Sequence, residues 1–180
     1  MSAAREAEAL EVAWQDAGWG PRRASPLAEH DPPLLFSLRW PAPWQVDEFR
    51  VDRTGAPWVI VTQRARLTLP RDGAPDMVLL AALSVSLADA GAPPPVSEMG
   101  DHARPVAGAH HVGVRTSAVR TAAIGAAGPR LEVRVVRFML STPYGVLALA
   151  FTAPQPQFYD VMEPMFDHIA QTARLDPCAS

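Results

Sequence analysis

The segment Gly145-Val-Leu-Ala-Leu-Ala-Phe-Thr152, with the proline-rich turn and the residues up to Leu175 that follow it, is the most strongly patterned part of the 180-residue sequence. Apolar residues occupy both alternating phases of the first stretch, which predicts a strand in the middle of a sheet with both faces covered. From Phe158 to Ile169 apolar residues recur at helical spacing, which predicts an amphipathic helix. Pro164 lies inside this pattern, so it either kinks the helix or begins a second helical segment.

Five other segments carry a strand-like pattern. They are residues 34–40, 58–69, 77–87, 109–124 and 131–140. The third also fits a helix, but Leu83, Val85 and Leu87 alternate with serines after a hairpin-like turn, which favours a strand. The short turn at residues 141–145 predicts an antiparallel hairpin. We therefore predict an α+β fold, in which a single antiparallel sheet of about six strands carries an N-terminal and a C-terminal helix.

The N-terminal part of the chain is predicted to be a helix followed by a linker. Ser2 can cap the helix, Leu10 lies on its narrow apolar stripe, and Gly18 and Gly20 end it. The predicted organisation is an N-terminal helix in residues 1–20, a proline-rich linker in 21–33, one α+β domain in 34–175 and a tail in 176–180.

The composition excludes several kinds of chemistry. All sixteen cationic residues are arginine, so the chain has no phosphate-loop lysine, no Schiff-base lysine and no lysine for biotin or lipoate. Cys178 is the only cysteine, which excludes an internal disulfide and sites built from several cysteines. The absence of lysine and asparagine, with abundant Ala, Arg, Pro and Gly, indicates a GC-rich genome and suggests an actinobacterial source.

Charge and hydropathy predict a soluble cytoplasmic protein. The net charge of −3 and the pI near 5.9 argue against nucleic acid or an anionic membrane as the main partner. The first residues lack the apolar stretch of a secretory signal, and no run of about 18 apolar residues occurs that could insert into a membrane.

The histidines form no recognised metal site. Adjacent His110 and His111 would point to opposite faces of a strand, and His102 lies at no usual ligand spacing from them. We therefore predict no metal, no cofactor and no catalytic residue.

Three carboxylates in the C-terminal helix have two interpretations. Asp160, Glu163 and Asp167 share one helical face. A paired-carboxylate acid/base site is the functional interpretation, and a solvated helix face is the structural one, which we favour.

Two stretches together resemble a known family. They are Phe36-Ser-Leu-Arg-Trp-Pro-Ala-Pro-Trp44 and Glu163-Pro-Met-Phe-Asp-His-Ile-Ala-Gln-Thr-Ala-Arg-Leu175. Both are similar to the Mog1/PsbP-like superfamily, which includes DcrB-type and actinobacterial LpqN-type proteins. The resemblance covers residues 34–175 and implies an antiparallel sheet with packed helices. It also implies protein binding without shared catalytic residues. The chain departs from the family at Pro93-Pro-Pro95, where a helix is expected, and in its N-terminal helix.

We predict a non-enzymatic adaptor or secretion-chaperone-like protein that recognises a protein partner and can form a homodimer. The N-terminal helix could pack on the domain or project from it. If it projects, the predicted partner contacts are Leu10, Trp14 and Trp19, because exposed aromatic residues are enriched at interfaces. Arg64 and Arg66, on the polar phase of their strand, could face an acidic partner or solvent.

Two alternatives remain open. A carrier of a small apolar ligand would hold its ligand in a cavity between the sheet and the C-terminal helix. An enzyme of unrecognised type would need at least two convergent polar residues. The candidates for such a site are His102, His110, His111, Arg115 and Arg120. The tryptophans Trp40, Trp44 and Trp58 are expected to close one end of the core.

Overall fold

The computed structural model describes residues 3–27, 31–52, 59–88, 103–107, 112–123 and 128–179. The helical segments are α1 (Ala3–Gln15), the 3₁₀ turn η2 (Pro156–Phe158) and α2 (Tyr159–Gln171). The strands are β1 (Trp19–Leu27), β2 (Leu34–Pro41), β3 (Gln45–Val46), β4 (Arg50–Asp52), β5 (Val59–Leu69), β6 (Met77–Ala88), β7 (Arg104–Ala107), β8 (Val112–Ala123), β9 (Arg130–Thr142), β10 (Gly145–Ala153) and β11 (Arg174–Pro177).

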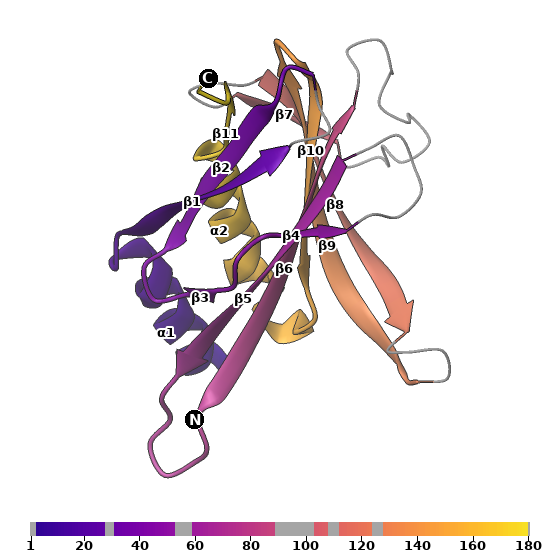
Figure 1. Ribbon diagram of the computed structural model, residues 1–180. Helices are drawn as coiled ribbons and strands as arrows, with labels where there is room; N and C mark the ends of the chain where they lie inside the picture. Colours follow the sequence, from indigo (N-terminus) through magenta and orange to yellow (C-terminus); the bar gives the residue numbers. More distant parts are fainter. Residues whose placement is uncertain are drawn as a thin grey trace.

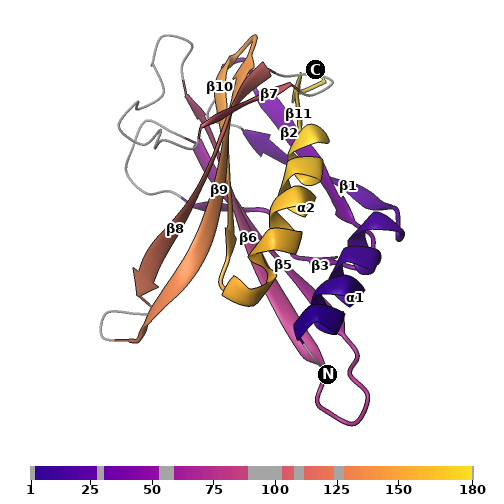
Figure 2. The ribbon, with the colours of Figure 1, turned by 180° about the vertical axis from the view of Figure 1, so that it is seen from behind.

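The strands form two antiparallel sheets (Figure 1). The small sheet has the order β1-β2-β11. The large sheet has the order β3-β5-β6-β10-β9-β8-β7, with β4 also paired to β5. Helix α2 lies between the two sheets, and α1 lies beside α2 (Figure 2). No helix in the described ranges is long and apolar enough to cross a membrane.

The predicted fold class is wrong. Each of the six predicted strands has a counterpart, namely β2, β5, β6, β8, β9 and β10, but they do not form one sheet. The described residues contain eleven strands in two sheets and only short helices, so the fold is mostly β rather than a six-stranded α+β layer. The first predicted strand, β2, leaves the others and pairs with β1 and β11.

The segment predicted as a linker supplies a strand. Residues 21–27 belong to β1, which pairs along β2 from Trp19 to Leu27. Pro21 and Pro26 are compatible with this position because β1 is an edge strand, and an edge strand leaves alternate N–H groups unpaired. Part of the predicted tail is also a strand, because β11 pairs with β2 up to Pro177.

The predicted hairpin at residues 141–145 is confirmed, since β9 and β10 pair antiparallel across it. Strand β10 lies between β6 and β9 in the middle of the large sheet, as predicted. Its odd-numbered side chains are buried against α2 and the small sheet, whereas the alternate side chains are half-buried, so the prediction that both faces are covered holds for one face only. We call these two sides the inner and the outer face of the large sheet.

The core lies between the inner face and the layer that covers it. Phe151 of β10 stacks on Phe166 of α2, with ring centroids 4.8 Å apart. Trp40 of β2 and Phe138 of β9 meet the same ring edge-on at 6.1 and 5.9 Å. Trp40 and Trp44 are both buried, as predicted, and Trp58 lies outside the described residues.

Helix α2 is continuous through Pro164, so of the two expected alternatives the start of a second helical segment does not occur. It buries Met162, Met165 and Ile169 toward the core, which confirms the amphipathic pattern. The N-terminal helix α1 packs on the domain, because Leu10 is fully buried and Glu6 forms an ion pair with Arg71 at 2.5 Å.

Candidate functional site

The three residues predicted to contact a partner lie in different environments. Leu10 is completely buried, and Trp14 is 9% exposed with its ring 5.2 Å from that of His168 on α2. Trp19, at the start of β1, is 42% exposed. Leu10 and Trp14 therefore hold α1 against the domain, and of the three only Trp19 is accessible to a partner.

Beneath α2, five polar side chains form a cluster that the sequence did not reveal. We call it the α2 cluster, and it consists of Arg115, Ser117, Arg134, Glu163 and Asp167. Strands β8 and β9 present the arginines and the serine from the inner face, and α2 presents the carboxylates one helical turn apart.

Arg115 is the centre of this cluster. Its Nε donates to Asp167 Oδ1 at 2.6 Å, and its Nη2 lies 3.4 Å from Glu163 Oε2. The arginine is only 8% exposed, so its guanidinium has lost most of its contact with water. The two carboxylates replace that contact. A buried guanidinium requires such partners, because an unpaired charge away from water is costly.

Glu163 also joins the helix to Ser117 and Arg134. The Ser117 hydroxyl donates to Glu163 Oε1, and Arg134 Nη1 lies 3.3 Å from the same oxygen. The cluster thus contains two arginines and two carboxylates, which balance one another. Its contacts suit the attachment of α2 to the large sheet better than the binding of a charged ligand.

Tyr159 extends the cluster along α2. The Arg134 guanidinium carbon lies 4.9 Å from the centre of the tyrosine ring, and the phenol donates to the Glu132 carbonyl at 3.1 Å. Burial raises the pKa of the phenol, although the charge of Arg134 acts in the opposite direction. The tyrosine therefore acts as a neutral hydrogen-bond donor that fixes the first turn of α2.

The sequence favoured a solvated helix face for Asp160, Glu163 and Asp167, and this interpretation holds only for Asp160. Asp160 is exposed, whereas Glu163 and Asp167 turn toward the sheet and pair with arginine. Burial raises the pKa of Asp167, and the hydrogen bond and charge of Arg115 lower it by less.

We expect Asp167→Asn to change stability in a pH-dependent way. Because the pKa of Asp167 is raised above its ordinary value of 3.8, the native state takes up a proton before the unfolded state does as pH falls. The wild type therefore gains stability from this group on acidification, whereas the variant does not. The free energy of unfolding of the variant minus that of the wild type should fall from neutral pH toward about pH 4.

Urea denaturation at several pH values measures this difference. Asp160→Asn, which removes an exposed carboxylate from the same helix, controls for the loss of negative charge from α2. If the free energy of unfolding of the variant minus that of the wild type increased on acidification, the raised pKa of Asp167 would be contradicted.

The residues considered for an enzyme do not meet in the described part of the chain. Arg115 lies on the inner face of β8, and Arg120 lies on the outer phase of the same strand and is exposed. His102, His110 and His111 fall outside the described residues. Within the described ranges, His, Cys, Asp and Glu form no group of three or more that could hold a metal ion.

The outer face of the large sheet has an unbalanced charge. Its side chains come from alternate positions of the five long strands. They include Thr62, Arg64, Arg66 and Thr68 of β5; Val78, Leu80, Ala82, Ser84 and Ser86 of β6; Val112, Val114, Thr116, Ala118 and Arg120 of β8; Leu131, Val133, Val135, Arg137, Met139 and Ser141 of β9; and Val146, Ala148, Ala150 and Thr152 of β10. None of these residues is acidic.

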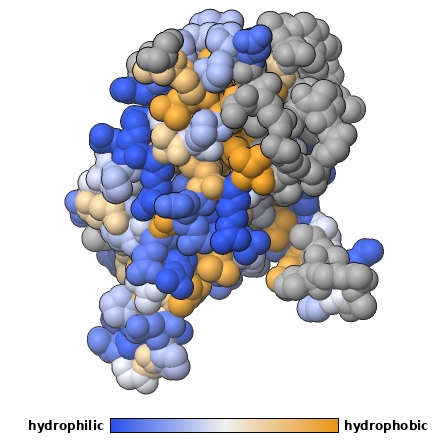
Figure 3. Space-filling model, viewed as in Figure 1, coloured by the Kyte–Doolittle hydropathy of each residue, from blue (hydrophilic) through white to orange (hydrophobic). Residues whose placement is uncertain are grey.

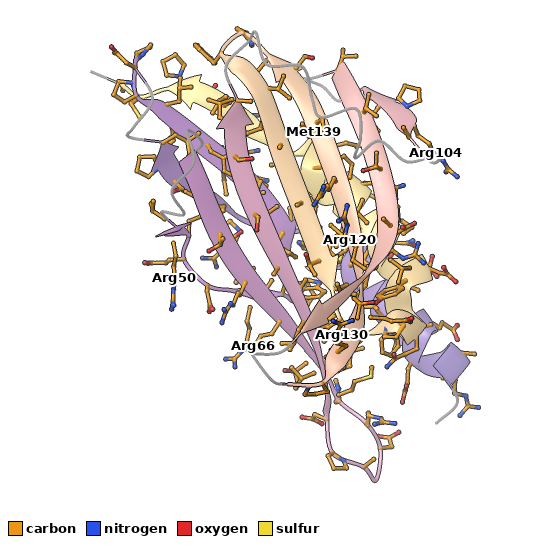
Figure 4. All side chains as sticks on the ribbon, turned by 90° about the vertical axis from the view of Figure 1, so that its right-hand side faces the viewer. Arg50, Arg66, Arg104, Arg120, Arg130 and Met139 are labelled. Atoms are coloured by element: carbon orange, nitrogen blue, oxygen red, sulfur yellow. The ribbon has the colours of Figure 1, made fainter. Side chains whose placement is uncertain are left out.

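The five long strands contain one carboxylate, that of Glu132, and it lies on the inner face. Glu132 of β9 is in phase with Arg134 and the fully buried Val136, so it lies on the inner face. Arg66, Arg120 and Met139 are labelled in Figure 4, which looks onto the outer face. The five long strands therefore contribute arginine and no carboxylate to the outer face, in a protein whose net charge is −3. At the edge of the sheet, β4 adds one residue of each sign, because Arg50 and Asp52 are in register with Thr62 and Ile60 of the outer phase.

Apolar side chains lie beside these arginines. Leu80 is 48% exposed and is the cross-strand partner of Arg66, while Val78, at 47%, is the partner of Thr68. The Gln155 side chain pairs with the backbone of β6 at this point. Its Oε1 accepts from Leu80 N, and its Nε2 donates to the Val78 carbonyl. The result is a mixed basic and apolar surface on a rigid strand pair.

Comparison with known proteins assigns no family. No protein-family model matches the chain, and no curated protein matches it. A crystal structure at 1.50 Å resolution of a protein from Bacteroides thetaiotaomicron VPI-5482 is similar, with 14% sequence identity and a TM-score of 0.49. The match covers 86% of this chain and 48% of that one, so the chain spans about half the length of that protein. The resemblance to the Mog1/PsbP-like superfamily stays a prediction.

Proposed function

We propose that the protein is a non-enzymatic binding protein whose outer sheet face recognises an acidic surface of a partner protein. The observation that carries this proposal is the charge of the five long strands, which contribute Arg64, Arg66 and Arg120 to the outer face and no carboxylate. A surface of one sign attracts a partner of the opposite sign and rejects partners of the same sign.

The apolar residues of this face supply the second element of an interface. Arginine and exposed aliphatic side chains together form contacts that combine hydrogen bonding with burial. Leu80 and Val78 provide the burial, and Arg66 is held by a 2.8 Å hydrogen bond from its Nε to Gln45. An arginine that is already oriented loses less side-chain entropy on binding.

Other regions offer less support for the predicted adaptor role. Leu10 and Trp14 are buried, so the N-terminal helix cannot present them to a partner. The space between α2 and the large sheet, where a carrier would place its ligand, holds the stacked rings of Phe151 and Phe166.

Charge reversal on the outer face tests the proposed function. We expect Arg64→Glu/Arg66→Glu to weaken capture of the partner by at least about tenfold, because two attractive contacts become repulsive. The matched control is Arg39→Glu/Arg174→Glu, which changes the net charge equally but lies on the small sheet. The measurement is quantitative mass spectrometry of proteins captured from the native host, at low and high salt.

The supporting result is a partner that is lost from the first double variant, kept by the control and released by salt. Thermal unfolding must show that both variants are folded. A partner lost equally from both variants would contradict the proposal, because its binding would follow net charge and not the outer face.

A further inference from the structure

A second concentration of positive charge lies on the small sheet, on the side that faces away from the core. In the β1–β2 pairing Arg22 is opposite Arg39, and in the β11–β2 pairing Arg174 is opposite Ser37. Ser37 and Arg39 are two residues apart in one strand and therefore share a face. The register thus gathers three arginines around Ser37, and we call Arg22, Arg39 and Arg174 the arginine cluster.

The side chain of Arg22 is fixed across β2. Its Nη1 donates to Ser37 Oγ at 3.2 Å and to the Thr172 carbonyl at 2.8 Å. Thr172 follows the last residue of α2, and its hydroxyl accepts from Arg39 N at 2.8 Å. The guanidinium covers Ser37, which is only 4% exposed. The Arg22 side chain is therefore held in place by hydrogen bonds, and the exposed Arg39 and Arg174 are set beside it by the strand register.

The positive charges of the arginine cluster repel one another. Burial lowers the pKa of Arg22, and the charges of Arg174 and Arg39 lower it further, while Asp176 acts in the opposite direction. Asp176 is exposed, and none of the three arginines forms an ion pair with a carboxylate of the described residues. Figure 3 shows hydrophilic side chains, with hydrophobic ones among them, over the side where β1 and β2 lie.

We propose that the arginine cluster binds a phosphate group. A guanidinium presents planar pairs of donors that match two phosphate oxygens, and several arginines around one point can share a doubly charged group. Bound phosphate would also remove the repulsion among the three arginines. This site is separate from the outer face of the large sheet, so it does not depend on the proposed function.

Isothermal titration with inorganic phosphate tests the site. We expect phosphate to bind the wild type and to raise its melting temperature above the value in sodium chloride of equal ionic strength. Arg39→Gln/Arg174→Gln should weaken phosphate binding by about tenfold or more, because it removes two charged donors. The matched control Arg64→Gln/Arg66→Gln removes the same charge from the large sheet and should bind phosphate like the wild type.

Two results would overturn the proposal. One is a melting temperature that responds equally to phosphate and chloride. The other is an equal loss of phosphate binding in the two double variants, because the effect would then follow net charge.

Vesicles distinguish the source of the phosphate group. The protein is sedimented with phosphatidylcholine vesicles that contain or lack phosphatidic acid. Binding that requires phosphatidic acid and is lost in Arg39→Gln/Arg174→Gln assigns the site to a lipid headgroup. Binding of inorganic phosphate without sedimentation assigns it to a soluble phosphate compound. Both of these results support the proposed phosphate site.

Discussion

Replacement of Phe151 by alanine is expected to lower the free energy of unfolding by about 3–5 kcal/mol. Phe151 is completely buried on the central strand β10, and its ring contacts Phe166, Trp40 and Phe138 from three other elements. Its truncation removes the stacked-ring contact between α2 and the large sheet and leaves a cavity that the surrounding strands cannot close. Urea denaturation followed by circular dichroism measures the loss.

Two comparisons separate the loss of packing from the loss of hydrophobicity. Phe151→Leu keeps most of the buried volume and should cost clearly less than the alanine variant. Val78→Ala removes an aliphatic side chain that is 47% exposed on β6, and we expect its cost to stay below about 1 kcal/mol. If Phe151→Ala cost no more than Val78→Ala, the stacked rings would not be what joins α2 to the sheet.

The sequence predicted the strands better than their arrangement. Alternation of apolar residues located six strands, and the apolar run at residues 145–152 correctly predicted the centre of the large sheet. The division into two sheets was not visible, because it depends on which strands pair and not on the pattern within each strand. β1 was missed since Pro21 and Pro26 indicate a loop unless the strand is known to lie at an edge.

The polar sites depend on contacts between distant parts of the chain. Glu163 and Asp167 have the sequence pattern of a solvated helix face, and only the packing of α2 on β8 brings Arg115 against them. Arg22 likewise reaches a carbonyl 150 residues away. The polar phase that contains Arg64 and Arg66 was visible in the sequence, because both arginines lie on one strand.

Gly113→Ala is expected to destabilise the protein by about 3 kcal/mol or more. Gly113 of β8 is opposite Leu140 of β9. A Cβ atom added to it would overlap the carbonyl oxygen of Met139 and lie 2.9 Å from Leu140 Cα. Both obstacles are backbone atoms of the neighbouring strand, so they can move only if the β8–β9 pairing is disturbed. Thermal and urea denaturation measure the cost.

Gly73→Ala is the matched control because Gly73 adopts a left-handed backbone conformation but has space for a Cβ atom. It lies in the turn between β5 and β6 with φ of +70°, and nothing lies within 4 Å of an added Cβ. Its replacement should cost only the left-handed backbone conformation, about 1–2 kcal/mol. Gly113→Ala should in addition displace Arg115, which is two residues further along β8, from its hydrogen bond to Asp167. Equal costs for the two variants would contradict the prediction, because β8 and β9 would then accommodate the added Cβ atom without loss of stability.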